Sequence, residues 1–166
     1  MFRKPFIAWF TGLACLLLAG CGGASVAILF FGDFPQDHVQ VVPFQKIVPA
    51  FDSAIGEPRR VVIRDLVAWD ALWREHAAGI SPPPPMPAIN FSQDMVIGVF
   101  LGSRGNDCHD VEIQSILEHT NPNHIEVNFH DIRSTINAPC NADFRHAAAL
   151  VVLKQSFLPV NFFEIN

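Results

Sequence analysis

The stretch AINFSQDMVIGVFLGSRGNDCHDVEIQSI, residues 88–116, decides the expected fold. Residues 95–102 carry no charge and are rich in Val, Ile and Phe, which is typical of a strand buried on both faces. Gly98, in the middle, predicts a point where a bulky neighbour or another backbone comes close. A turn signal, SRGND, follows, and then apolar and polar residues alternate from Val111 to Gln114. The stretch therefore predicts a central β-hairpin with Cys108 at the start of its second arm.

The flanking sequence predicts one helix and several strands. Residues 65–78 have Asp65 as a candidate N-cap and Gly79 as a stop, and one helical face carries Leu66, Trp69, Trp73 and either His76 or Ala77. Such a stripe is more often the side that packs on a sheet than a ligand platform. Further strands are expected at residues 39–42, 60–64, 124–132, 147–153 and 157–165. We therefore expect an α+β domain, an antiparallel β-rich sheet with one amphipathic helix packed on it.

The N-terminus has the features of a lipoprotein signal. Arg3 and Lys4 form a basic start, residues 6–19 are apolar, and Leu18-Ala19-Gly20-Cys21 is similar to a bacterial lipobox. We expect cleavage before Cys21, which would then carry lipid. The predicted organisation is a signal peptide over residues 1–20, a lipidated tether over 21–38 and a domain over 39–166. An uncleaved membrane anchor is the alternative, since residues 5–32 carry no charge.

Charge narrows the classes of partner. Removal of Arg3 and Lys4 from the 11 basic side chains leaves 9 against 16 acidic ones, a net charge of −7 with histidine neutral. Nucleic-acid binding relies on Lys and Arg to neutralise phosphates, so an acidic domain argues against it. Both readings of the N-terminus place the folded part outside the cytoplasm. The residue after the cysteine is Gly22 and not an aspartate, which favours the outer membrane over the inner one.

Two cysteines remain in the expected domain. Cys108 and Cys140 form an even pair in an oxidising compartment, so we predict a disulfide between them. In the chain-entropy model, a bridge that closes a loop of about 33 residues stabilises the fold by roughly 3–4 kcal/mol. The competing hypothesis is a thiol nucleophile in Cys108-His109-Asp110. Neighbouring residues in a strand point to opposite faces, which disfavours a direct bond between that thiol and His109.

The histidines and acidic residues offer two further hypotheses. His124 and His130 share a strand face but lie roughly 20 Å apart along it, too far to share an ion. A metal site could still be assembled across strands, from His109 with His130 or from His119 with His124. Glu112 and Glu126 are candidate cross-strand neighbours and would be a carboxylate pair for hydrolysis. The sequence has no metal-binding spacing such as HExxH or CxxC, so solvent-facing histidines remain the simpler interpretation and no cofactor is expected.

Several short motifs together resemble the C-terminal domain of the PrcB-type protease-complex lipoproteins. They are Trp69 with Trp73, then PAINF at residues 87–91, MVIGVFLG at 95–102, VEI at 111–113 and VVLK at 151–154. The resemblance covers roughly residues 60–155. It implies a small β-rich domain in a lipid-anchored accessory protein that is associated with a surface protease complex, and it carries over no catalytic residues.

The resulting expectation is a non-enzymatic envelope lipoprotein that binds or stabilises another envelope protein, such as a protease. The alternative is a periplasmic protein that binds a metal or small ligand through surface histidines, with His109, His124 and His130 as candidates. A hydrolase that uses a thiol or carboxylates is the third hypothesis.

Overall fold

The computed structural model describes residues 35–47, 51–133, 140–141 and 146–166, all of which belong to one compact unit. The predicted signal peptide, Cys21 and most of the predicted tether lie outside the described residues. Within the described ranges, no helix is long and apolar enough to cross a membrane.

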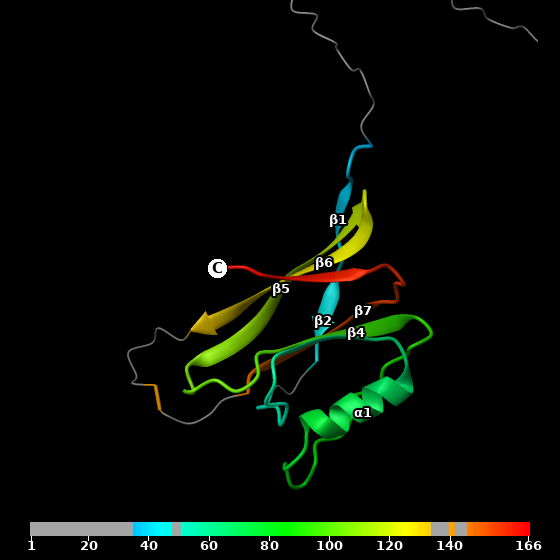
Figure 1. Cartoon of the computed structure of the whole chain (residues 1–166). Coiled ribbons are helices and arrows are strands. Elements are labelled where there is room, and N and C mark those ends of the chain that lie inside the picture. The colour runs from blue at the N-terminus through cyan, green and yellow to red at the C-terminus, as the bar shows by residue number, and fades with distance from the viewer. Residues whose placement is uncertain (1–34, 48–50, 134–139, 142–145) are drawn as a thin grey trace, which may run out of the picture. The chain divides into compact units, whose positions relative to one another are not determined.

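In the described residues, eight strands form two four-stranded sheets (Figure 1). Sheet A has the order β1-β5-β6-β8, and sheet B has the order β2-β7-β4-β3. All neighbours pair antiparallel except β6 and β8, which are parallel. The strands are β1 Val39–Val41, β2 Phe44–Lys46, β3 Arg59–Ile63, β4 Asp94–Phe100, β5 His109–Thr120, β6 Asn123–Arg133, β7 Ala148–Lys154 and β8 Val160–Glu164. One helix, α1, lies within these ranges and spans Leu66–His76.

The predicted α+β class with one antiparallel sheet is wrong. The fold is mainly β, with 45% of the described residues in strands and 9% in helix. The helix has only 11 residues, whereas β5 and β6 have 12 and 11. A continuous apolar strand requires a cover on each face, but its sequence does not say whether a helix or a second sheet supplies each cover. Here one cover is the helix and the other is sheet A.

Strand β4 is the shared element of the two cores. Met95, Ile97 and Val99 are fully buried and point into the core between the sheets, with the apolar residues of β5 and β6. Val96 and Phe100 are fully buried on the other face, in the core beneath α1. The prediction of a strand buried on both faces is therefore confirmed.

Side chains of neighbouring strands come close to Gly98, as the sequence predicted. A Cβ atom at this position would lie 2.7 Å from Leu150 Cδ2 and 2.8 Å from Val61 Cγ2, both on the strands that flank β4. These separations are too short for carbon atoms, so a side chain at position 98 would push the neighbouring strands' side chains away.

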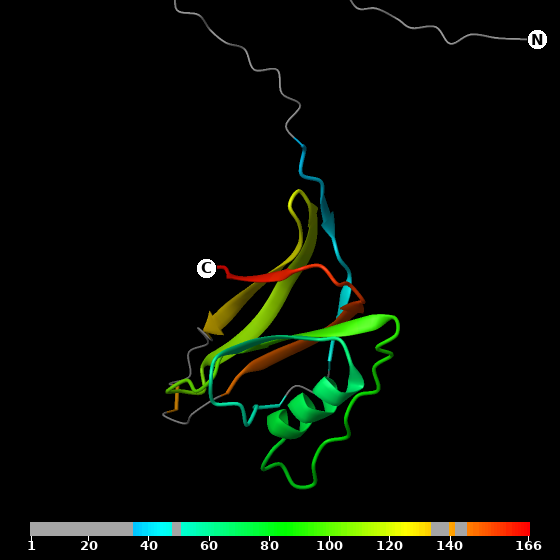
Figure 2. The ribbon, with the colours of Figure 1, turned by 45° about the vertical axis from the view of Figure 1, so that its right-hand side comes forward.

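The predicted central hairpin is also wrong, because β4 and β5 lie in different sheets. Strand β4 pairs with β3 and β7, whereas β5 pairs with β1 and β6. Gly102, with φ of +72°, turns the chain away after β4. The segment from residue 101 to 108 therefore connects one sheet to the other. Similarly, β1 and β2 are separated by only two residues but belong to different sheets. The chain therefore crosses from sheet A to sheet B between these two strands (Figure 2).

Helix α1 begins where the sequence predicts. The Asp65 carboxylate accepts a hydrogen bond from Ala68 N at 2.8 Å, which satisfies one of the free N–H groups of the first turn. Gly79, with φ of +83°, follows the helix as a stop. The buried face consists of Trp69, Leu72, Trp73 and His76. Leu66, which was expected on that face, is 57% exposed, because it lies in the first turn beyond the edge of the core.

Candidate functional site

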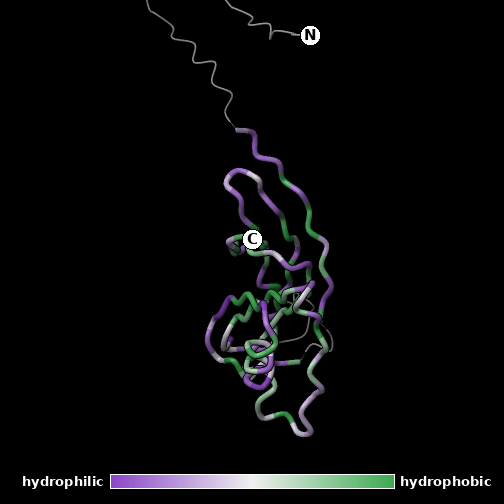
Figure 3. Tube along the Cα trace, turned by 90° about the vertical axis from the view of Figure 1, so that its right-hand side faces the viewer, coloured by the Kyte–Doolittle hydropathy of each residue, from purple (hydrophilic) through white to green (hydrophobic). Residues whose placement is uncertain are grey.

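The outer face of sheet A carries most of the candidate polar side chains. Along β6, Ile125, Val127 and Phe129 are buried toward the core. His124, Glu126, Asn128 and His130 point the other way, as the alternation predicts. The only helix in the described ranges packs on sheet B, so it does not cover this face (Figure 1). The turn between β5 and β6 is mainly hydrophilic (Figure 3).

Three potential metal ligands come together at the turn end of this face. His119 of β5 lies directly opposite His124 of β6, and their rings stack with centroids 4.4 Å apart. Glu126 is two residues further along β6, on the same face, and its Oε2 lies 3.6 Å from His119 Nε2. One ligand atom from each of the three residues lies within 4.8 Å of the other two. The cross-strand pair of His119 with His124 is one of the two that the sequence singled out.

Each histidine of this cluster has an outer partner on its Nδ1 atom. His119 Nδ1 lies 2.6 Å from Asp37 Oδ2, and His124 Nδ1 lies 2.7 Å from the Pro122 carbonyl oxygen. A carbonyl oxygen only accepts hydrogen bonds, so His124 carries its proton on Nδ1. The hydrogen bond from His119, with two backbone N–H donors, holds the pKa of Asp37 below its usual value. Asp37 is therefore an ionised acceptor, and His119 also carries a proton on Nδ1.

Asp37 connects the start of the domain to the β5–β6 turn. Besides His119, its carboxylate accepts hydrogen bonds from Thr120 N at 3.0 Å and Asn121 N at 3.1 Å. Asn121 Nδ2 in turn donates to the Pro35 carbonyl oxygen at 2.7 Å. Local sequence patterns do not reveal this contact, because more than 80 residues separate Asp37 from the turn.

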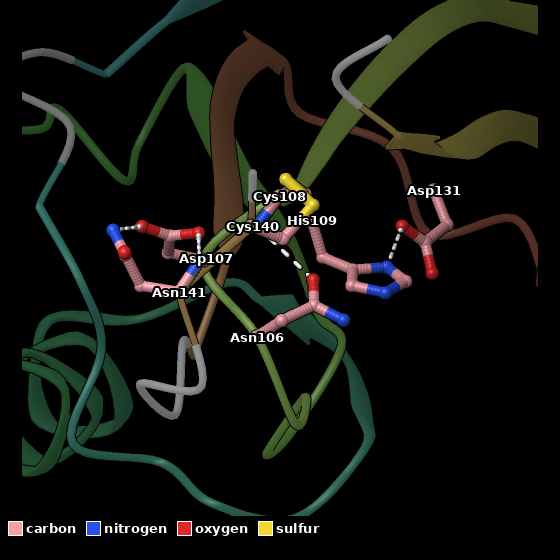
Figure 4. Close-up of a disulfide and its surroundings, with 7 residues drawn as sticks. All are labelled: Asn106, Asp107, Cys108, His109, Asp131, Cys140 and Asn141. Carbon is pink, nitrogen blue, oxygen red and sulfur yellow. Dashed lines mark hydrogen bonds and ion pairs between the residues drawn. A yellow bond between two sulfur atoms is a disulfide. The ribbon is translucent and has the colours of Figure 1, made fainter. Parts of the chain in front are cut away.

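The second predicted histidine pair, His109 with His130, does not form. In the β5–β6 register, His109 lies opposite Arg133 and His130 opposite Glu112, three positions away and on the other face. His109 Nδ1 instead contacts Asp131 Oδ1 at 2.7 Å (Figure 4). His130 Nε2 lies 3.7 Å from Glu112 Oε2. Each histidine thus has a carboxylate neighbour of its own.

The predicted carboxylate pair of Glu112 and Glu126 is wrong. Glu126 lies opposite Leu117, five residues beyond Glu112 on β5. The register is set at the turn, where His119 lies opposite His124, and the alternation pattern alone does not show it. Glu112 instead forms an ion pair with Lys46 of β2. This hydrogen bond is the main reason that the pKa of Glu112 lies below its ordinary value.

The predicted disulfide between Cys108 and Cys140 is present, with Cα atoms 5.4 Å apart (Figure 4). Beside it, Asn141 donates to both carboxylate oxygens of Asp107, through N and Nδ2, at 2.8 Å each. The bridge connects the start of β5 in sheet A to the segment that precedes β7 in sheet B. With its sulfur in this bond, Cys108 has no thiol for the nucleophile hypothesis.

The two tryptophans of α1 belong to the core, as interpreted. Trp69 is fully buried and Trp73 is 5% exposed. Their Nε1 atoms donate to backbone carbonyls of the proline-rich segment, Trp69 to Pro87 at 3.0 Å and Trp73 to Pro84 at 3.2 Å. The prolines thus cover the indole edges and satisfy their polar atoms.

Sequence reasoning missed one serine–histidine contact. Ser103 Oγ lies 2.8 Å from His146 Nε2, and His146 Nδ1 lies 2.9 Å from the Ser53 carbonyl oxygen. The three residues come from three separate connections, so no motif in the sequence links them. The arrangement joins the segment before β3 to those around β4 and β7.

No family model, no curated protein and no solved structure matches this chain. The resemblance to the PrcB-type lipoproteins therefore stays a prediction based on the motifs quoted above.

Proposed function

We propose that this chain is a non-enzymatic lipoprotein of the bacterial cell envelope, anchored by lipid on Cys21, with the outer membrane favoured. Its domain binds or stabilises another envelope protein, and a protease is the first candidate. Three features support the proposal: the lipobox-like Leu18–Cys21 sequence, a disulfide that suits an oxidising compartment, and the motif resemblance to PrcB-type accessory lipoproteins.

The observation that carries the binding role is a set of exposed apolar side chains near the start of α1. Val67 is 81% exposed and Leu66 is 57% exposed in the first helical turn, and Phe157 is 84% exposed in the β7–β8 connection. We call these three residues the apolar corner.

Arg64 brings the two segments of the apolar corner together. Its Nε donates to the Ser156 carbonyl oxygen at 2.7 Å, and its Nη2 donates to that of Leu158 at 3.1 Å. These bonds hold the backbone on both sides of Phe157 close to Arg64, which lies two residues before Leu66. Large apolar side chains that gather at one place on a surface mark protein-binding sites more often than scattered ones do.

Site-specific photo-crosslinking in intact cells tests this role. A photo-reactive residue at position 67 should yield one discrete adduct with an envelope protein, and Phe157→Ser should reduce that adduct at least fivefold. The matched control is position 41, where Val41 is also well exposed, at 68%, but lies on β1 of sheet A. Equal adducts from positions 41 and 67, or no adduct from position 67, would contradict the proposal.

The anchor has a separate test. Cys21→Ser should abolish metabolic labelling with palmitate and leave the precursor uncleaved, because the lipid is attached to the cysteine sulfur. Membrane fractions after density separation should show the wild-type chain in the outer membrane. Normal labelling and processing of the variant would show that the lipobox assignment is wrong.

A further inference from the structure

We propose that His119, His124 and Glu126 bind one divalent transition-metal ion of the zinc class on the outer face of sheet A. This site is independent of the apolar corner and goes beyond an accessory role. Two imidazoles and one carboxylate are a donor set that zinc accepts, with a fourth position left for water. Calcium and magnesium prefer oxygen ligands alone and do not fit it.

The outer partners prepare both rings for an ion. Because the Nδ1 atoms of His119 and His124 donate to Asp37 and to the Pro122 carbonyl, it is the Nε2 atom of each ring that can offer a lone pair to a metal. A histidine that donates its other ring N–H to a carboxylate or a carbonyl is the usual arrangement around protein-bound zinc. Both histidines of this cluster have such a partner.

His119 Nε2 is the second observation that indicates a ligand. This atom is buried and has no hydrogen-bond partner among the described residues. Glu126 Oε2, at 3.6 Å, is too far for a hydrogen bond. The other oxygen, Oε1, accepts a hydrogen bond from Asn128 Nδ2 at 2.7 Å, which fixes the carboxylate with Oε2 toward the histidine. An ion between these two atoms would satisfy both.

The spacing requires only a local adjustment. Ligand atoms around a tetrahedral zinc ion lie roughly 3.4 Å apart, given bonds of about 2.1 Å. The 3.6 Å separation of His119 Nε2 from Glu126 Oε2 is already close to this value. The two imidazole rings are nearly parallel, with an angle of 13° between their planes, so one must turn to point its Nε2 at the shared ion. We expect His124 to turn, because its partner Pro122 is in the adjacent turn, whereas Asp37 holds His119 in place.

Zinc titration of the purified, full-length mature lipoprotein in detergent tests the site. After removal of metals with a chelator and dialysis, calorimetric titration with Zn²⁺ alone should show one ion per chain. His124→Ala and Glu126→Gln should each weaken the affinity at least tenfold. Asp37→Asn should weaken it about 10–100-fold through the orientation of His119, as loss of an outer partner does at other zinc sites. Excess Ca²⁺ should not compete.

The matched control is His130→Ala. His130 lies on the same strand and face but contacts Glu112, so its loss should change the affinity less than twofold. Each variant's thermal unfolding is recorded with chelator present, and His124→Ala should unfold as the wild type does, because its side chain lies on the outer face of sheet A and not in the core. Nitrogen NMR shifts of the histidine rings should move at Nε2 of His119 and His124 when zinc is added.

Two results would overturn the proposal. The first is the absence of saturable zinc binding at micromolar concentrations in the wild type. The second is an equal loss of affinity in His130→Ala and His124→Ala, which would mean that zinc binds histidines of the surface without a defined site. In either case the cluster is a hydrogen-bonded clasp between Asp37 and the β5–β6 turn and not a metal site.

Discussion

The outer faces of the two sheets place histidine in opposite surroundings. On sheet B, α1 covers the face, and His76 is 4% exposed among the rings of Phe51, Trp73 and Phe100. Burial without a charged partner lowers the pKa of His76 to about 4. On sheet A, which α1 does not cover, His119 lies between the carboxylates of Asp37 and Glu126.

The difference shows how the covering layer determines the role of a side chain. Under a helix, an imidazole has no water and no anion to stabilise its charge, so it stays neutral and packs as an aromatic ring. On an open face, the same side chain can be oriented by hydrogen bonds and keep an atom for a ligand. The following predictions test the comparison, from the largest expected effect to the smallest.

Trp69→Ala should have the largest effect, because it removes the fully buried centre of the covered face. Truncation of a buried tryptophan leaves a cavity and an uncompensated Pro87 carbonyl, and we expect a loss of about 3–5 kcal/mol in the free energy of unfolding. Urea denaturation measures it. The matched variant on the open face is Leu117→Ala, at a partly exposed position, where we expect a clearly smaller loss. Equal losses would mean that burial beneath α1 stabilises the fold no more than packing on the open face of sheet A does.

Cys108→Ser should cost roughly 2–5 kcal/mol, because the disulfide holds a connection between the two sheets. Cys140→Ser should cost the same, and the double variant no more than either single one, since all three remove one bond. Urea denaturation of the purified domain gives the values, and non-reducing peptide mapping should show the linked peptides. A Cys108 that is alkylated without reduction would contradict the bond.

The pH dependence of stability should contain a contribution of at most about 3 kcal/mol from His76. The pKa is lowered in the folded state, from 6.5 to about 4, so the unfolded state binds the proton more readily. This contribution is present above pH 6.5 and is lost as the pH falls toward 4. His76→Phe should flatten the profile between these values while it leaves stability at pH 8 nearly unchanged. An unchanged slope in His76→Phe would show that other groups cause the acid sensitivity.

Some of the fold could be predicted because it depends on local pattern. The apolar run around Gly98, the alternation along β6 and the Asp65 cap were all predicted correctly, since each follows from strand or helix periodicity. The disulfide was predicted correctly because only two cysteines remain in the domain. The hairpin of β4 with β5 was predicted wrongly, because a turn signal indicates a change of direction and not the partner of the next strand.

The residues of the candidate metal site also divide into those that the sequence predicted and those that it did not. His119 and His124 could be named together because a short turn joins their strands. Glu126 was assigned to the wrong partner, because pairing of His119 with His124 at the turn places Leu117, and not Glu112, opposite Glu126. Asp37 was not considered, because its contact with His119 depends on how the first strand meets the turn.

By itself, the sequence determined the helix and most of the strand segments, though not β2 or the full length of β5, and also the buried face of β6, the disulfide partners and the pair of histidines at one turn. These features depend on residues close in the chain or, for the cysteines, on a count that leaves one pairing. Only the tertiary structure decided that the strands form two sheets, that α1 covers one outer face and not the other, and that Asp37 reaches His119. Such features result from packing between segments that are distant in the chain, which periodicity and turn chemistry do not encode.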